Sequence, residues 1–501
     1  MNSNGVNGSA MHTPALIWEM GIVNGAGKFL TAETFGFKIN VSATTLKKKQ
    51  IWTIIPDTVS DHFFIKSHLN KYLSSDKDGK VSCEIEECGK EEQFLIEYCP
   101  KGTGKWSFKS AAYGYYFTGS EDRIDCFSKT PSWWSVRLAV HPQMHMQNMK
   151  RQRYVRLQDS ELRGDQTIPW GYDSLITLEH SPCGRVAICS RDHRYLHREG
   201  HVTEEMSEDT VFGLEVRGGA TPGMAFKDKE GKYLTLIGNT GTLKSKNKAI
   251  GKDELFIMEI SFPQVGLKAH NGKYASIKQG MDLYANQADA GEKEIFQFEY
   301  QNKPGQWKIR SSDGKYWTVS SVNNGIKATS DGRDASSAFN VESLASGKIL
   351  LKASNDMFVT SRKLGVMTAS GDKADDPENL FQLILLNRPL IIFKSEFGLV
   401  GTRNGRIECN MSSYESFELQ SVNDGNYNLK VRGDKDVYWK VADDGSIKVD
   451  ASIPAQQFVI LFQSGTHCAI LAPNGRYIRG EQNGLMKADS EEINKASLWE
   501  F

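Results

Sequence analysis

The sequence repeats one short pattern about every 40 residues, and this period constrains the fold more than any other feature. In each copy a turn residue and a polar residue precede an aromatic residue and then an apolar one. The copies are GKFL at 27, NKYL at 70, GYYF at 114, QRYV at 152, HRYL at 193, GKYL at 231, GKYA at 272, GKYW at 314, DMFV at 356, DVYW at 436 and GRYI at 475. The one double-length interval, between Phe358 and Tyr438, contains EFGLVGTR at 396–403, which completes twelve copies.

A second motif, an aromatic residue or leucine that opens a strand, runs alongside the first. Examples are FLIEY at 94, LITLE at 175, VFGLEV at 211 and IFQFEY at 295. The strand-like runs are short, and turn sequences such as DKDG, NNG and PNG separate them. This alternation predicts an all-β chain built from tight hairpins.

Twelve repeats could form an open solenoid, a propeller or several closed units. Pro142, Pro263 and Pro389 follow every third repeat, which favours four units of three. A closed unit of three hairpin-rich repeats is a β-trefoil, and closure removes exposed sheet edges. We therefore expect four tandem β-trefoils at 18–139, 140–260, 261–386 and 387–501, after a disordered lead-in at 1–17. The recurring aromatic residues are expected in the core, around the pseudo-threefold axes.

Composition excludes several classes of protein. The 501 residues include 61 basic and 61 acidic side chains, so the formal net charge is zero. Eight cysteines follow no zinc spacing and form no CxxC, which indicates free thiols in a reducing compartment. We find no secretion signal and no apolar run long enough to span a bilayer, so we expect a cytosolic protein without membrane insertion.

The sequence shows no catalytic constellation, so we expect neither an enzyme nor a cofactor. His141 and His145, in HPQMHMQ, have a spacing that could bind a metal, but no nearby cysteine or carboxylate completes a ligand set. Linker histidines are the favoured interpretation. Cys83 and Cys88 are five residues apart on an expected hairpin, and unpaired thiols are favoured there.

Basic residues gather in four stretches: Lys47–Lys49, KRQRYVR at 150–156, KSKNKAIGK at 244–252 and SRK at 361–363. The first stands out from an ordinary solvated loop because Ile51 and Trp52 open a strand directly after it. A nucleic-acid-binding chain would be basic overall, and three lysines fall short of the four to eight typical of readers of anionic lipid. An acidic face of a protein partner fits the first cluster as well as nucleic acid or anionic lipid does.

The segment LTAETFGFKINVSATTLKKKQIW at 30–52 resembles the fascins, a family of actin-filament bundling proteins. SHLNKYLSSDKDGKVSCE at 67–84, IPWGYDSLITL at 168–178, QGMDLYANQ at 279–287, LNRPLIIF at 386–393 and the terminal SLWEF resemble the same family, in order along nearly the whole chain. The resemblance implies a monomer of four trefoils. It would crosslink parallel F-actin in filopodia, microspikes and other cell projections.

The resemblance also implies site residues. The first actin-binding site would lie where the first and last trefoils meet, and its members here are Lys28, Glu33, Lys47, Lys48, Lys49, Glu396 and Arg403. Phe397 and Asn404 stand where fascins commonly carry a histidine and a basic residue. A second site on other trefoils would include Lys246, Lys248, Arg362 and Lys363. Thr45 takes the place of a regulatory serine modified by protein kinase C, and Ser276 matches a second modified position.

A carbohydrate-binding trefoil is the alternative. Lectins of the ricin type repeat a QxW motif, and here only Gln50, Ile51 and Trp52 fit it. Co-sedimentation with actin filaments, set against retention on a glycan array, distinguishes the two.

Overall fold

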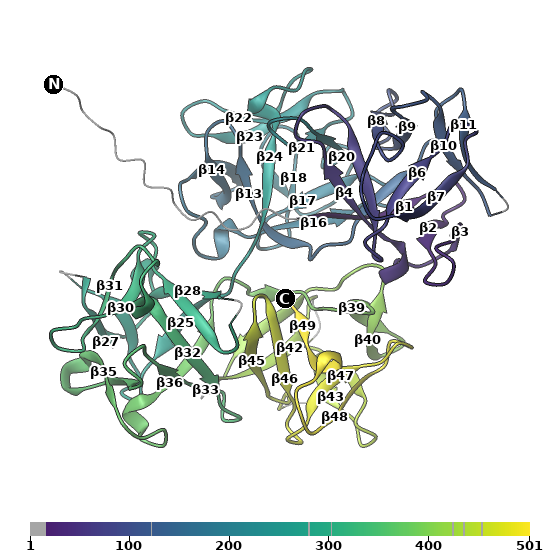
Figure 1. The fold of residues 1–501 in the computed structure, drawn as a ribbon. Coiled ribbons are helices and arrows are strands. Elements are labelled where there is room, and N and C mark those ends of the chain that lie inside the picture. The colour runs from purple at the N-terminus through teal and green to yellow at the C-terminus, as the bar shows by residue number, and fades with distance from the viewer. Residues whose placement is uncertain are drawn as a thin grey trace, which may run out of the picture. The chain divides into compact units, whose positions relative to one another are not determined.

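The computed structural model describes residues 17–121, 123–278, 281–301, 303–422, 425–433, 436–451 and 454–501. These residues form four antiparallel sheets, which follow one another along the chain (Figure 1). The predicted lead-in at 1–17 lies outside the described residues except for Ile17. No helix in the described ranges is long and apolar enough to cross a membrane.

The first sheet is a closed barrel of six strands that carries three hairpins. Its barrel strands are β1 (Trp18–Val23), β4 (Ile51–Pro56), β5 (Phe63–Ser67), β8 (Phe94–Tyr98), β9 (Trp106–Ser110) and β12 (Ser135–Leu138). Its hairpins are β2 (Phe29–Ala32) with β3 (Ile39–Ala43), β6 (Tyr72–Ser75) with β7 (Val81–Ile85), and β10 (Tyr116–Gly119) with β11 (Ile124–Ser128). β12 pairs with β1, and a bridge between Trp106 and Trp134 completes the barrel.

The second and third sheets repeat this arrangement. The second barrel contains β13 (Gln143–Asn148), β16 (Ile176–His180), β17 (Val186–Cys189), β20 (Val211–Arg217), β21 (Gly223–Lys227) and β24 (Phe256–Ile260), with hairpins β14 (Arg153–Gln158)/β15 (Glu161–Gln166), β18 (Tyr195–Leu196)/β19 (Val202–Thr203) and β22 (Tyr233–Ile237)/β23 (Thr242–Asn247). The third contains β25 (Gln264–Lys268), β28 (Ile295–Tyr300), β29 (Gln306–Arg310), β32 (Ala338–Ser343), β33 (Lys348–Lys352) and β36 (Leu380–Leu385), with hairpins β26 (Tyr274–Ile277)/β27 (Leu283–Gln287), β30 (Tyr316–Val319)/β31 (Ile326–Ser330) and β34 (Phe358–Ser361)/β35 (Met367–Gly371).

In the fourth sheet the first barrel strand is split into two short segments. Its barrel contains β37 (Leu390–Ile391), β38 (Lys394–Ser395), β41 (Phe417–Ser421), β42 (Asn426–Val431), β45 (Phe458–Ser464), β46 (His467–Leu471) and β49 (Trp499–Glu500), with hairpins β39 (Gly398–Arg403)/β40 (Arg406–Met411), β43 (Tyr438–Val441)/β44 (Ile447–Asp450) and β47 (Tyr477–Gly480)/β48 (Met486–Ser490). Six barrel positions and three hairpins in each sheet make the fold all-β with four β-trefoils, as predicted.

Short 3-10 turns precede many of the barrel strands. They are η1 (Lys48–Gln50), η2 (Tyr172–Ser174), η3 (Lys252–Glu254), η5 (Glu292–Glu294), η6 (Ala335–Ser337), η7 (Lys363–Gly365), η8 (Pro377–Asn379) and η10 (Lys495–Ser497). Most of them, such as η1 and η5, lead directly into a barrel strand. Such a turn fixes the direction in which the chain enters the barrel.

The chain divides into two compact units, and each is described by itself. The third barrel, within 259–387, belongs to one unit together with 463–466. Residues 16–258, 388–462 and 467–501, which carry the first, second and fourth barrels, form the other. The four predicted domain boundaries stay predictions, although residues 139–142, 261–263 and 386–389 connect successive sheets.

The first two barrels share one hydrophobic core and are joined by direct hydrogen bonds. The Tyr98 hydroxyl donates to the Val216 carbonyl at 2.6 Å and accepts from the Val216 amide at 2.8 Å. The Trp106 indole donates to the Leu214 carbonyl at 2.7 Å. These bonds fall on buried or partly buried groups of the first two barrels, so the barrels are held by paired polar atoms as well as by apolar burial.

The repeated turn residue has a backbone requirement that explains the motif. It takes a positive φ at Gly27, Asn70, Gly114, Gln152, His193, Gly231, Gly272, Gly314, Asp356 and Gly475. Glycine and asparagine are favoured there because a bulkier side chain meets its own backbone in the left-handed region. The pattern in the sequence therefore records a left-handed turn before ten of the twelve hairpins.

The prediction that the repeated aromatic residues form the core is wrong for about half of them. Phe29, Tyr116, Tyr154, Tyr233 and Tyr316 are buried, whereas Tyr72, Tyr195, Tyr274, Phe358, Tyr438 and Tyr477 are half-buried. The fully buried residue is the next one along: Leu30, Leu73, Phe117, Val155, Leu196, Leu234, Ala275, Trp317, Val359, Trp439 and Ile478; in the copy at 396–403 it is Val400, after Leu399. In many copies a bulge follows the aromatic residue, as at Tyr233, and shifts the register of the hairpin there.

The aromatic rings have a flanking role instead. Lysines of the preceding barrel strand lie over them, for example Lys109 at 5.1 Å from the Tyr116 ring centre and Lys268 at 5.2 Å from that of Tyr274. Several of their hydroxyls bond to the glutamate of the second sequence motif, as Tyr233 does to Glu215 at 2.9 Å. The rings with these contacts therefore tie their hairpins to the barrel strands.

Candidate functional site

The lysine turn, residues 47–50, is a rigid projection from the first barrel. Gln50 is buried, and its amide side chain accepts from the Lys47 amide at 3.0 Å and donates to Thr31 Oγ1 at 3.0 Å. The side chains of Lys47, Lys48 and Lys49 are exposed. Three positive charges thus stand on a turn that is fixed by its own buried glutamine.

Three equivalent turns in other repeats carry a net negative charge. Their sequences are Gly89-Lys90-Glu91-Glu92, Gly251-Lys252-Asp253-Glu254 and Gly291-Glu292-Lys293-Glu294. In each, the last glutamate accepts from the glycine amide, at 2.7 to 2.9 Å, as Gln50 does in the lysine turn. The geometry of the turn therefore needs no lysine, and the KKKQ sequence at 47–50 requires a different explanation.

Glu33 and Asn40 border the lysine turn. Lys49 Nζ lies 2.7 Å from Glu33 Oε2, and the Asn40 amide donates to Glu33 Oε1 at 2.9 Å. The hydrogen bond from Lys49 holds the pKa of Glu33 below its ordinary value. Within the described ranges Lys47 and Lys48 form no ion pair, so their charge is available to a partner.

The pKa of His68 responds to the positive charge of the lysine turn. Burial lowers its pKa, and the positive charges of Lys48 and Lys49 lower it further, while Glu33 acts in the opposite direction. Lys28, half-buried at the turn before β2, has its backbone amide bonded to Asn24 Oδ1 at 2.9 Å. The structure thus gathers Glu33 and the lysine triplet, with Lys28 on the same barrel.

The two predicted site residues of the fourth barrel lie on β39 and just before it. Glu396 accepts from Lys495 Nζ at 2.5 Å, and Arg403 pairs with Glu408 at 2.8 Å. Both are exposed. In the described part of the chain no ion pair joins them to the lysine turn, and both groups belong to the same compact unit.

The first barrel does approach the fourth at another point. Lys394 of β38 pairs with Glu500 at 2.9 Å, and both act electrostatically on Glu19 of β1. Burial raises the pKa of Glu19, Lys394 lowers it and Glu500 raises it. These charges lie at the junction that the resemblance implies for the first site.

The predicted second site is divided between the two units. Lys246 and Lys248, at the end of β23, are exposed on the second barrel, whereas Arg362 and Lys363 are exposed on the third. Arg362 donates to Ser370 Oγ at 3.1 Å. Each pair is available for contact on its own unit.

Other basic residues are engaged within the protein. Lys150 pairs with Asp253 at 2.7 Å, Arg156 with Asp165 at 2.8 Å, and Arg151 donates to the Leu236 carbonyl at 2.7 Å. The stretch at 150–156 therefore braces the second barrel and is not a free cationic surface.

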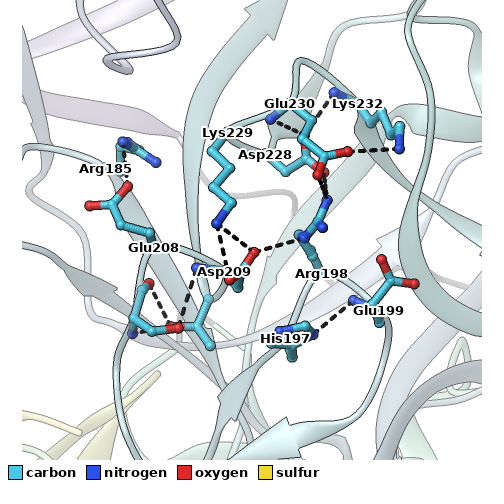
Figure 2. Close-up of polar contacts among 12 residues, drawn as sticks. Arg185, His197, Arg198, Glu199, Glu208, Asp209, Asp228, Lys229, Glu230 and Lys232 are labelled. Atoms are coloured by element: carbon cyan, nitrogen blue, oxygen red, sulfur yellow. Dashed lines mark hydrogen bonds and ion pairs between the residues drawn. The ribbon is translucent and has the colours of Figure 1, made fainter.

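Figure 2 shows a larger network of this kind on the second barrel. Arg198 lies 2.7 Å from Asp209 and 2.5 Å from Glu230, and Lys229 and Lys232 pair with the same two carboxylates at 3.0 and 2.8 Å. Opposite charges alternate across it. Such a surface presents little net charge to a ligand, in contrast to the lysine turn.

Thr45 and Ser276, the two predicted modification sites, differ in access. Thr45 is exposed. Ser276 is 3% exposed in β26, and its hydroxyl donates to Glu294 Oε1 at 2.5 Å. Ser276 thus fixes η5 as Thr31 fixes the lysine turn, and this burial argues against its modification in the folded protein.

The remaining candidates have structural roles. His141 Nε2 bonds the Ile392 carbonyl and His145 Nδ1 the Ser174 carbonyl, each at 3.0 Å. His141 lies in the connection before β13, which fits the linker interpretation, whereas His145 lies within β13, so that interpretation is wrong for His145. All eight cysteines are free, as predicted. Gln50 and Trp52 of the one QxW motif are buried.

One cluster escaped the sequence analysis: Glu179, Cys189 and His193, whose ligand atoms lie within 4.8 Å of one another. A signal was present, because Cys189 and His193 are four residues apart. The carboxylate that completes the set comes from the neighbouring strand, and only the pairing of β16 with β17 brings it there.

Four barrels with internally paired charges and one prominent cationic turn define a β-trefoil scaffold protein. A fascin-domain model matches residues 26–134, 144–258, 267–383 and 397–501. The chain is 38% identical to Fascin-2 of Mus musculus over 96% of this chain and 98% of that protein, and 32% identical to Fascin of Strongylocentrotus purpuratus over 97% and 99%. It is 24% identical to Fascin-3 of Mus musculus over 98% of each chain. The chain belongs to the fascin family and is, like it, structural and not an enzyme.

Proposed function

We propose that the protein crosslinks actin filaments into parallel bundles. The observation that carries this proposal is the lysine turn, in which three consecutive lysines are exposed, whereas the equivalent turns at 89–92, 251–254 and 291–294 each have one lysine and two acidic residues. Actin filaments are acidic, so these charges would steer association and pair with the filament, while zero net charge limits binding to other polyanions. Membership of the fascin family supports the same function.

Bundling needs two separated filament-binding surfaces on one chain. The first would combine the lysine turn with Lys28, Glu33, Glu396 and Arg403. The second would use Lys246 and Lys248 of the second barrel, Arg362 and Lys363 of the third, or both pairs. Two surfaces on one chain allow a monomer to crosslink, and its place would be the cytoplasm, in filopodia and other actin-rich projections.

We expect the K47A/K48A/K49A variant to lose bundling while it stays folded. Three exposed charge contacts of about 0.5 kcal/mol each correspond to roughly tenfold weaker binding. Low-speed co-sedimentation with actin filaments measures bundling, and circular dichroism checks the fold. The matched control is K77A/K80A/K90A, which removes the same charge from exposed positions of the same barrel. If both triple variants lose bundling equally, the lysine turn acts only through its contribution to the overall charge and is not a specific binding site.

The second surface is tested by separating binding from bundling. K246A/K248A and R362A/K363A should each leave high-speed sedimentation with single filaments nearly unchanged and reduce low-speed pelleting. Because the pairs belong to different units, they are measured separately. A parallel loss in both assays would place the altered residues in the first site, and retention of the protein on a glycan array without actin pelleting would favour the carbohydrate-binding alternative.

A further inference from the structure

A cluster of three chemically different ligand groups lies on the second barrel, apart from the proposed actin sites. It consists of the Glu179 carboxylate, the Cys189 thiol and the His193 imidazole, and we call it the ligand cluster. All three ligand atoms lie within 4.8 Å of one another, and Glu179 Oε2 is 3.2 Å from His193 Nε2. Cys189 is completely buried.

The fold fixes the cluster through strand register and one turn. Cys189 of β17 pairs with Thr177 of β16, and Glu179 lies two residues further along β16, on the same face. Diagonal neighbours across an antiparallel pair are close enough for long side chains to meet. His193 follows in the turn after β17, where its amide donates to the Ser190 carbonyl at 2.8 Å.

Thiolate, imidazole and carboxylate together form a set of ligands that Zn²⁺ accepts. Zinc binds four ligands in a tetrahedron, with distances of about 2.0 to 2.2 Å to nitrogen and oxygen. Two such ligands are then about 3.3 Å apart, close to the 3.2 Å between Glu179 and His193. A thiolate and a carboxylate also balance the charge of the ion, so that little net charge would be buried.

The surroundings suit a bound cation. The hydroxyls of Tyr195 and Tyr414 each lie 3.3 Å from Glu179 Oε2 and can hold that carboxylate in position as outer partners. The positive charge of Arg432 acts on Cys189 and would repel a bound cation, but the Arg432 side chain is exposed, and water screens its charge.

We propose that Glu179, Cys189 and His193 bind one Zn²⁺ ion. The side chains of Glu179 and His193 keep 27% and 12% of their exposure, which leaves an approach from solvent and a fourth position for water. Because Tyr414 belongs to the fourth barrel, the ion would strengthen the contact between the second and fourth barrels through Glu179. The site makes no use of actin, so it stands or falls independently of the proposed function.

The test uses the full chain in a C88S/C99S/C183S background, which removes the cysteines that keep some exposure. Calorimetric titration with ZnCl₂ should show one ion per chain, and Co²⁺ should give the near-ultraviolet charge-transfer band of a cobalt thiolate. Adding Cys189→Ser should remove this band and weaken binding at least tenfold. Zinc should also raise the thermal midpoint of the background protein but not of the Cys189→Ser variant.

His193→Asn is the second variant, because asparagine occupies the same left-handed turn position at Asn70 and keeps the backbone. It should weaken zinc binding at least tenfold and leave circular dichroism unchanged. Gln152→Asn, at the equivalent turn position before β14, is the matched control and should bind like the background. The proposal is overturned if the background protein gives neither heat nor a cobalt band, or if folded Cys189→Ser and His193→Asn both keep full affinity.

Discussion

Thr45 is the residue at which charge could regulate the lysine turn. It is exposed two residues before Lys47. A phosphate there would add about −1.5 to −2 charges at neutral pH, next to three ammonium groups. It would cancel most of the local positive field and repel an acidic filament.

We therefore expect Thr45→Glu to weaken bundling, most clearly at low salt, and Thr45→Ala to bundle like the parent. Low-speed co-sedimentation across a salt series measures the effect, because screening should reduce the difference as salt rises. Thr58→Glu places the same charge at another exposed threonine of the first barrel and is the control. If Thr45→Ala loses bundling as well, together with thermal stability, the hydroxyl has a structural role in the loop.

Single residues also show how far the sequence could predict the site. The lysine turn was recognisable because its three charges are adjacent and precede a strand. The burial of Ser276 was not recognisable, because it depends on a hydrogen bond to Glu294, which lies in a turn 18 residues later in the chain. The burial of the repeated aromatic residues depended on a bulge, which the alternation of residue types does not reveal.

At the scale of the element, the left-handed turn is the part of the repeat that the sequence describes best. Gly272, between β25 and β26, has φ +73° and no atom within 4 Å of an added Cβ. Gly365, in η7, has φ +80°, and an added Cβ would lie 2.3 Å from the Ala285 carbonyl oxygen. The two glycines share a backbone requirement and differ in the space around them.

This pair gives a matched prediction. Gly272→Ala should destabilise the third barrel by about 1 to 2 kcal/mol, the cost of a left-handed alanine. Gly365→Ala should add about 1 to 3 kcal/mol for the clash, since backbone must move to relieve it. Differential scanning calorimetry of both variants measures the difference. Equal shifts in midpoint would mean that the hairpin β34–β35 relaxes without loss.

Barrel closure and the count of four were predictable from the twelve-fold period, since three hairpins suffice to close one unit. The connections between barrels were not, because residues far apart in the sequence form them. Trp106 and Leu214 are one such pair, and His141 and Ile392 are another. Sequence periodicity predicts the strands and hairpins inside each barrel, but it carries no information on which faces of different barrels pack together.

At the scale of the molecule, one buried and one half-buried histidine lie where barrels join. His141 bonds the Ile392 carbonyl of the fourth barrel, and His180 accepts from the Leu138 amide of the first at 2.8 Å. Burial lowers the pKa of both, and of His145, to about 4. All three are therefore neutral in the folded protein at pH 7.

These pKa values predict a loss of stability in mild acid. The unfolded chain takes up protons near pH 6.5 and the folded chain only near pH 4, so stability is complete above pH 6.5 and falls as the pH drops between these values. Each histidine can contribute up to about 3 kcal/mol to this loss. Thermal midpoints measured from pH 7.5 to 4.5 should fall, and His180→Gln should make the fall less steep.

His270→Gln is the control for this series, because His270 is exposed. Its pH profile should match that of the parent. A parent midpoint that stays constant between pH 6.5 and 4.5 would contradict the assignment of neutral buried histidines.

The seam between the first two barrels has a mechanical consequence. Tyr98 of the first barrel bonds to Val216 of the second, and Trp106 bonds to Leu214. The Asp57 backbone carbonyl accepts from the Gly219 amide at 2.8 Å. Bonds that lie side by side share a tangential pull and must rupture together, whereas bonds in series yield one at a time. We therefore expect a force on the lysine turn to be transmitted to the second barrel, and the two barrels to move as one rigid body without a hinge between them.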